Sequence, residues 1–223
     1  MADVDDKGAQ PLAQPLAQSS PELHGHGLRL CRWDAESDAD VEAWLRGLLD
    51  PEFQRWNTPL IPVRDLDGAR ESMRAKARNA ANGTGVSFRI ADAVTGQTLG
   101  HIGINDINPA VRLARVGYWV LPESRGRQVA TRALTLAARH AFTDLGLNRL
   151  ELDHALGHDA SCRIAERCGF RYEGTMRGAM FDAGRHDAFR DAHLHARIAA
   201  DAEPEAGQGS GGRDSGVTAT AAP

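Results

Sequence analysis

A short basic stretch of the chain has the residue types that bind phosphate groups. Residues 117–131, GYWVLPESRGRQVAT, predict a strand, a glycine-containing turn and a helix that begins at about Ala130. The first N–H groups of a helix have no partner within the helix, and the helix dipole adds partial positive charge there. Arg125, Arg127 and Arg132 supply formal charge near the same point. The stretch therefore suits a ligand rich in phosphate.

The composition is that of a globular protein. The 223-residue chain is 42% hydrophobic and 25% charged, and no apolar run approaches the roughly 20 residues of a membrane-spanning helix. Its acidic start, MADVDD, differs from the basic start of a secretory signal. Cys31, Cys162 and Cys168 form no even disulfide set and lack metal-ligand spacing. We expect a cytoplasmic protein without membrane contact.

The net charge of −4 comes from the two ends of the chain. Residues 1–26 and 199–223 each hold four acidic residues and one basic residue, so the body carries a small positive excess. No basic stripe with interleaved aromatic residues accompanies that excess, which argues against a nucleic-acid partner.

The chain divides into one domain and two tails. Residues 1–26 repeat the tetrapeptide PLAQ, and residues 201–223 are rich in glycine, serine and alanine. Neither segment can bury enough apolar surface to offset the entropy of ordering, so both are predicted to be disordered. The folded domain is expected over residues 27–200.

Hydrophobic periodicity predicts an α+β fold for this domain. Helices are predicted over about 37–49, 65–82, 130–145 and 159–168, and strands over about 28–33, 86–90, 99–107, 112–120, 150–152, 171–181 and 189–198. This order implies a mixed seven-stranded sheet with helices on both faces, as in an α/β/α sandwich. Residues 118–120 and 150–152, joined by one long helix, should form a parallel pair.

Three segments together resemble a known enzyme family. They are residues 117–131, 159–170 and 173–178, the last with 195–198 behind it, and their order and spacing are similar to those of the GNAT superfamily. That family consists of acyl-CoA-dependent N-acyltransferases, and the chain most resembles the RimJ/RimL-like branch of ribosomal-protein N-terminal acetyltransferases. The resemblance implies a mostly antiparallel sheet and acetyl-CoA as the co-substrate.

The resemblance also implies which residues bind the co-substrate. In the family, a bulged strand pairs with the pantetheine arm, and the backbone amides of the following turn bind the pyrophosphate of coenzyme A. The corresponding residues here are Trp119, Val120, Leu121, Arg125, Gly126, Arg127, Gln128, Val129, Ala130 and Thr131.

Several positions depart from the family pattern. The second glycine of the turn is Gln128, which is expected either to alter the turn or to donate its side-chain amide to phosphate. The usual asparagine before the second motif is His158, and a common glutamate before the Gly-Tyr pair is Arg115. The aromatic phenol often found on the last strand is replaced by His195.

Acyl transfer to an amine requires alignment of a neutral amine, stabilisation of an oxyanion and a proton or hydrogen bond for the leaving thiolate. By resemblance, the N–H of Val120 would stabilise the oxyanion, and Ser161 and His195 are the candidate catalytic side chains. Ser161 could equally satisfy a backbone amide at a helix start, and His195 could be a partly exposed strand histidine that shares a strand face with His193 by alternation. No side chain stands out as the general base: His101, Asp106 and His158 are available, and solvent could carry the proton through a chain of water molecules.

Two pairs of histidines raise the question of whether the chain binds a metal ion. His193 and His195 share a strand face, and His154 and His158 lie close in sequence. No carboxylate or cysteine set evident from the sequence completes a site, and the family uses no metal, so none is expected.

These features lead to an expected function. The chain is interpreted as an acetyl-CoA-dependent N-acetyltransferase acting on a primary amine, either a peptide N-terminus or the amine of a small metabolite or antibiotic. RimL-like relatives tend to carry a glutamate where this chain has Met180, which weakens ribosomal-protein modification. A non-catalytic acyl-CoA sensor and a binder of another phosphate compound are the alternatives. The interpretation is compatible with a homodimer.

The segment 51–59 is expected to be a loop, and in relatives this loop borders the acceptor cleft.

Overall fold

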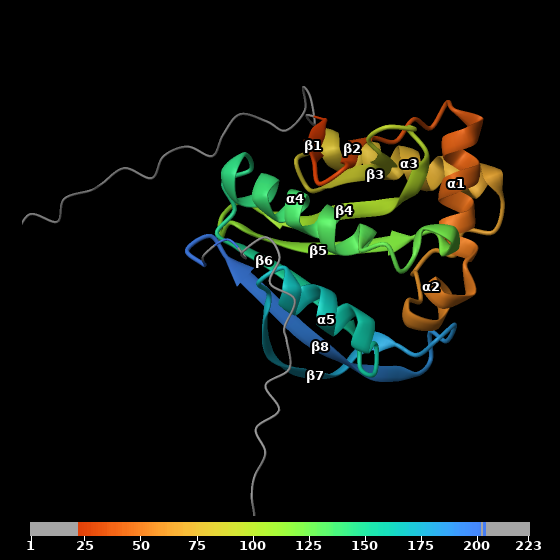
Figure 1. Ribbon diagram of the computed structural model, residues 1–223. Coiled ribbons are helices and arrows are strands. Elements are labelled where there is room, and N and C mark those ends of the chain that lie inside the picture. Colours follow the sequence, from red (N-terminus) through yellow and green to blue (C-terminus); the bar gives the residue numbers. More distant parts are fainter. Residues whose placement is uncertain (1–21, 202, 204–223) are drawn as a thin grey trace, which may run out of the picture.

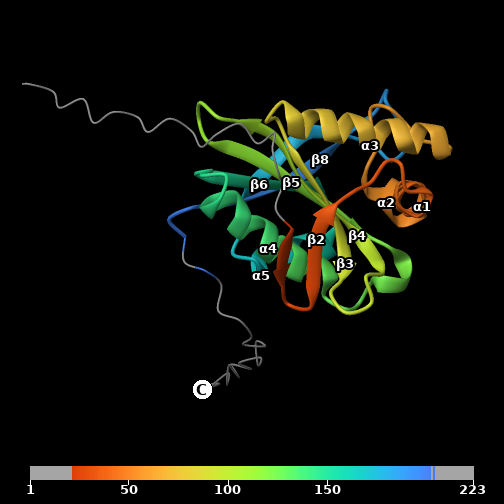
Figure 2. The same cartoon turned by 90° about the horizontal axis from the view of Figure 1, so that it is seen from above.

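A computed structural model describes residues 22–201 and residue 203, in which one mixed sheet carries helices on both faces (Figures 1 and 2). The strands are β1 (Leu23–Gly25), β2 (Leu28–Arg32), β3 (Val86–Asp92), β4 (Thr98–Asn108), β5 (Leu113–Val120), β6 (Arg149–Ala155), β7 (Arg171–Phe181) and β8 (Phe189–Ile198). The helices are α1 (Asp38–Leu49), α2 (Pro51–Trp56), α3 (Leu66–Ala81), α4 (Val129–Thr143) and α5 (Asp159–Arg167), with a short 3-10 turn at Pro122–Ser124. The predicted α+β class is confirmed.

The sheet has eight strands in the described residues, so the expected count of seven was wrong. The additional strand, β1, lies inside the segment 1–26 that was predicted to be a disordered tail. It pairs with β2 through a two-residue turn in which His26 and Gly27 both have positive φ angles, 51° and 72°. Such turns usually contain Asn-Gly, and three residues give no usable periodicity, which explains the omission. Residues 1–21, 202 and 204–223 lie outside the described part, and the tail predictions there stay predictions.

The strand order is β1-β2-β3-β4-β5-β6-β8-β7, and every neighbouring pair except β5–β6 is antiparallel. The predicted parallel pair is confirmed, but its position differs from the expected one. Pairing joins Leu113–Arg115 of β5 to Arg149–Glu151 of β6, rather than residues 118–120 to 150–152. Beyond these three pairs β5 and β6 diverge toward the end of the sheet where α2 lies (Figure 1).

The helices form two layers, each with its own core. On one face, α4 and α5 pack on a core of strand residues that includes Phe88, Ile102 and Leu152. On the other face, α1 and α3 pack over Trp119 and Leu121, which lie at the end of β5 (Figure 2). No helix within the described residues is long and apolar enough to span a membrane.

Helix α2 corrects the expectation of a loop over residues 51–59. Its first residue is Pro51, and the Asp50 side chain accepts a hydrogen bond of 2.9 Å from the Phe53 N–H. An acidic N-cap followed by proline at the first helical position is a helix-start pattern. Pro51 follows closely after the end of α1 and is also the first residue of α2, so a single proline marks both helix boundaries.

Three tryptophans enclose His101 beneath α1. The His101 ring centroid lies 4.8 Å from that of Trp44 and 5.6 Å from that of Trp119. The Trp33 indole N–H donates to His101 Nδ1 at 3.1 Å. Burial, with a smaller contribution from Lys76, lowers the pKa of His101 to about 3. This candidate base is therefore a neutral core histidine, and it is not among the residues that line the cavity described below.

We predict that replacement of Gly100 by alanine destabilises the protein by about 2–3 kcal/mol or more. Gly100 is opposite Val120 in the β4–β5 pair, and an added Cβ would lie 2.3 Å from the Trp119 carbonyl oxygen. Gly117→Ala is the matched control on the neighbouring strand, because nothing lies within 4 Å of its added Cβ. Urea denaturation should place that control within about 1 kcal/mol of wild type; equal losses in the two variants would contradict the close approach.

We also predict that His101 makes the protein acid-sensitive. Its pKa is depressed in the folded state, so the unfolded chain binds more protons as the pH falls below about 6.5. Stability is then complete above that pH and declines toward the folded pKa of about 3, by up to about 1.4 kcal/mol per pH unit. His101→Gln should flatten this dependence between pH 6.5 and 5 in urea titrations. An unchanged slope would show that other groups control the acid sensitivity.

Candidate active site

A cavity of about 370 Å³ lies where β5 and β6 diverge. Its volume is in the range of small-molecule sites. The lining residues come from α2 and its end, from β5, from the turn and first residues of α4, and from α5. They are Glu52, Phe53, Trp56 and Asn57; Tyr118, Trp119 and Val120; Ser124, Arg125, Gly126, Gln128, Val129, Ala130 and Thr131; and His158, Ala160, Arg163, Ile164 and Arg167.

Eight of the ten residues predicted to bind coenzyme A line this cavity. The two exceptions are Leu121, which is buried in the core under α1 and α3, and Arg127, whose side chain is exposed. The tertiary structure thus places the predicted residues of β5 and of the following turn along the same cavity.

The turn before α4 keeps the backbone shape expected of two glycines. Gly126 has a φ of 72°, and Gln128, at the N-cap of α4, has a φ of 57° in the left-handed region. A non-glycine residue there costs about 1–2 kcal/mol. The Gln128 side chain forms no capping hydrogen bond, so the first N–H groups of α4 are left open beside the cavity. Gln128 therefore adopts a left-handed conformation that glycine takes without strain.

One arginine of the turn and one in the first turn of α4 hydrogen-bond to the surrounding backbone. Arg125 forms an ion pair with Asp50, the N-cap of α2, and its Nε donates to the Val120 carbonyl at 3.2 Å. Arg132 donates to the carbonyls of His26 and Arg127 at 2.7 and 3.2 Å. These contacts fix the turn against α2 and against the β1–β2 turn.

Sequence reasoning missed two further cations at the cavity. Arg163 and Arg167 are one helical turn apart on α5, and both line the cavity. Their spacing of four residues was a detectable signal for a shared helix face. The face they point to depends on how α5 packs, which the sequence does not give.

The backbone of β5 offers hydrogen-bonding groups along the cavity. The Leu121 N–H donates to the Leu99 carbonyl at 2.9 Å, so Leu99 and Leu121 form a hydrogen-bonded pair across the two strands. Antiparallel pairs alternate, so the adjacent pair of Gly100 and Val120 is not hydrogen-bonded. The Val120 N–H and carbonyl therefore point away from β4, toward the edge that β6 has left.

Ser161 lies behind the cavity wall rather than on it. It is buried near the start of α5, and its Oγ is 2.9 Å from the hydroxyl of Tyr118, which does line the cavity. Burial is the main factor that raises the pKa of Tyr118, so its hydroxyl stays protonated. Tyr118 is not among the residues predicted from the sequence, and only its contact with Ser161 and its place on the cavity reveal it.

His158 lies on the cavity wall opposite β5. Its ring stacks on Trp56 with centroids 4.5 Å apart and an angle of 4° between the planes. Burial, and to a lesser extent His154, lowers its pKa to about 4. His158 is therefore a neutral imidazole at neutral pH, able to accept a hydrogen bond from a bound molecule.

The structure places His195 apart from the cavity. Its side chain is fully buried on β8 and is not among the lining residues. Burial lowers its pKa, and the Phe170 carbonyl opposes that shift without meeting hydrogen-bond geometry with either ring nitrogen. The catalytic role expected of His195 stays a prediction that this placement does not favour.

Comparison with known proteins agrees with this architecture. Over 91 residues, 41% of this chain and 50% of that protein, the sequence is 33% identical to YdaF of Bacillus subtilis (strain 168). Over 102 residues, 46% and 55% of the two chains, it is 30% identical to the ribosomal-protein-serine acetyltransferase of Escherichia coli (strain K12). The chain thus spans about half the length of these curated relatives.

A similar fold occurs in the solved structure of Mycobacterium smegmatis RimJ in complex with CoA-disulfide. Its TM-score is 0.67 at 24% identity, covering 77% of this chain and 81% of that one. A family model described as the acetyltransferase (GNAT) domain matches residues 28–171, which is more than half of the chain. With the fold, the cavity and this match in agreement, the chain belongs to the GNAT acetyltransferase family.

Proposed function

We propose that the protein is an acetyl-CoA-dependent N-acetyltransferase with a primary amine as acceptor. The observation that carries this proposal is the free edge of β5, which runs along a cavity that ends at the open N-terminus of α4. An extended pantetheine arm can hydrogen-bond to such an edge, and the pyrophosphate can accept hydrogen bonds from the helix N–H groups. Arg163 and Arg167 add positive charge on the facing helix.

The donor thioester is then held next to Val120. A neutral amine attacks the thioester carbonyl carbon, and the Val120 N–H donates to the oxyanion that forms. The carbon–sulfur bond breaks as the intermediate collapses, which leaves an amide and a thiolate. Tyr118, with its hydroxyl hydrogen-bonded to Ser161, donates to the departing sulfur. The proton lost by the amine passes to solvent, and Tyr118 regains from solvent the proton that it gives to the sulfur, so the transfer is balanced.

The acceptor enters beside α2. Glu52, Trp56 and His158 form that wall, and the Trp56 indole N–H donates to the Glu52 carboxylate at 2.8 Å. Glu52 is the one carboxylate among the lining residues of the cavity, and it would attract a cationic amine before deprotonation. A peptide N-terminus and the amine of a small metabolite or antibiotic both meet this requirement. The cytoplasmic location and the homodimer remain predictions.

The proposal predicts both binding and turnover. Isothermal titration of the full chain with acetyl-CoA should show one site per chain, with coenzyme A as a competitor. A thiol-release assay over a panel of peptides and small amines should then identify at least one acceptor. Tight acetyl-CoA binding without turnover on any amine would support the non-catalytic sensor instead. Absence of competition by coenzyme A would support a different phosphate ligand.

Tyr118→Phe is predicted to lower kcat by about 100-fold, because the departing thiolate loses its proton donor. The Kd for acetyl-CoA should stay within about threefold of wild type, since the ring that lines the cavity is retained. Tyr172→Phe is the matched control, because its hydroxyl contacts Thr175 outside the cavity. Ser161→Ala should have a smaller effect than Tyr118→Phe; the opposite order would make Ser161 the direct donor.

A further inference from the structure

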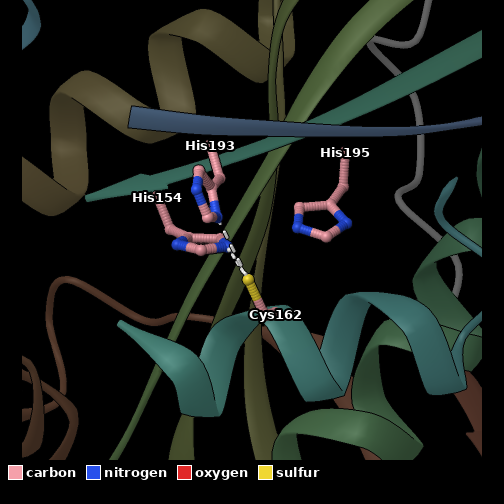
Figure 3. A group of neighbouring side chains, drawn as sticks. All are labelled: His154, Cys162, His193 and His195. Atoms are coloured by element: carbon pink, nitrogen blue, oxygen red, sulfur yellow. Dashed lines mark hydrogen bonds between the residues drawn. The ribbon is translucent and has the colours of Figure 1, made fainter. Parts of the chain in front are cut away.

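Four side chains with metal-binding atoms meet behind α5 (Figure 3). They are His154 of β6, Cys162 of α5, and His193 and His195 of β8, and their ligand atoms all lie within 4.8 Å of one another. The Cys162 Sγ is 3.3 Å from His154 Nε2 and 3.3 Å from His193 Nδ1. None of the four lines the cavity, so the cluster is separate from the candidate active site.

The sheet register produces this convergence. His154 and His193 are directly opposed in the β6–β8 pair, and His195 lies two residues further along β8 on the same face. Helix α5 packs on that face and brings Cys162 over the histidine rings. Sequence reasoning paired His193 with His195 and His154 with His158, and it found no cysteine to complete a set. The cysteine comes from a separate element, so only the packing of α5 reveals it.

The His154 ring is oriented so that it can bind a metal ion. His154 Nδ1 is 3.1 Å from the Ala155 carbonyl, which can only accept, so Nδ1 carries the proton and the lone pair of Nε2 points toward Cys162. A carbonyl partner on the second ring nitrogen is typical of metal-ligating histidines. A single thiol proton, moreover, cannot serve both of the imidazole nitrogens that approach the Cys162 sulfur.

His195 supplies an independent observation. Its side chain is fully buried, and neither ring nitrogen has a hydrogen-bond partner among the described residues. A buried polar group without a hydrogen-bond partner destabilises the folded state, and buried polar groups are rarely left in this state. The ring lies stacked on His154, with centroids 5.3 Å apart, beside the other donor atoms. A cation bound between the four side chains would satisfy one of these nitrogens.

We propose that His154, Cys162, His193 and His195 form a structural zinc site. Three imidazoles and one thiolate complete a tetrahedron, and four protein ligands are typical of structural rather than catalytic zinc. Zinc–ligand distances of about 2.0–2.3 Å imply ligand separations of roughly 3.3–3.8 Å. The present separations of up to 4.8 Å therefore need to close by about 1 Å when the metal binds.

Zinc can reach the proposed site from solvent, and its binding releases one proton. Cys162 and His193 are half-buried, so the ion can enter from their side. Zinc displaces the Cys162 thiol proton, which passes to solvent, and forms four coordinate bonds without any change in oxidation state. The bound ion would fasten the first turn of α5 to β6 and β8. Ser161 precedes Cys162 on that turn, so the metal would also fix the position of the Tyr118 partner.

The test is metal binding by the full chain prepared without a histidine tag. Zinc-loaded protein should retain about one zinc per chain after gel filtration, measured by plasma mass spectrometry. Cobalt(II) substituted for zinc should give the intense visible bands of tetrahedral coordination and a thiolate-to-cobalt charge-transfer band. Zinc should also raise the melting temperature of wild type, because it binds the folded state.

Matched variants locate the site. Cys162→Ser should abolish the charge-transfer band and lower zinc retention at least tenfold, and His193→Ala should lower retention as well. Cys31→Ser is the control, because this free cysteine lies on β2 and is not part of the cluster. Circular dichroism checks that each variant folds.

Three outcomes would overturn the inference. They are less than about 0.1 zinc per wild-type chain, zinc retention that Cys162→Ser does not reduce, and retention of copper but not of zinc. Acetyl-CoA titration of the same samples keeps this result separate from the proposed enzymatic function.

Discussion

The early end of the β5–β6 pairing is the constraint on which this structure depends. Parallel strands normally continue to pair side by side, but here hydrogen-bonded register is limited to Leu113–Arg115 and Arg149–Glu151. Among the described residues, the last five residues of β5 consequently have no strand partner on that side, where the Val120 carbonyl accepts a hydrogen bond from Arg125. Buried backbone groups require partners, so this edge either faces solvent or binds an extended ligand. The cavity occupies the space that the divergence opens.

The other side of β5, which pairs with β4, has to be rigid if the free edge is to hold a ligand in one position. There, Gly100 allows the backbones of β4 and β5 to approach so closely that no Cβ fits. Trp119 and Leu121 point into the tryptophan-rich core beneath α1 and α3. Arg125 then ties the end of β5 to Asp50 and the start of α2. Strand β5, the turn after it and α2 are thus held as one unit, which fixes the position of the Val120 N–H.

Helix α5 connects the two sites proposed for this protein. One of its faces presents Arg163 and Arg167 to the cavity, and Ser161 reaches the hydroxyl of Tyr118. Another face places Cys162 over the histidines of β6 and β8. A nine-residue helix has little stability of its own and depends on packing for its position. A metal on the far side of α5 would therefore support the geometry of the cavity without touching a substrate.

The sequence by itself determined the elements whose signals are local. The side chains of Ser37 and Asp65 accept hydrogen bonds from the first N–H groups of α1 and α3, as N-cap residues do. The basic turn before α4 was recognisable from its residues alone. The number of strands and the helix α2 were not, because β1 is three residues long and Pro51 serves two helices. Only the tertiary structure decided which side chains meet: Tyr118 with Ser161, Trp56 with His158, and Cys162 with three histidines. These contacts join residues on different elements, and their distances depend on strand register and helix packing, which hydrophobic periodicity does not encode.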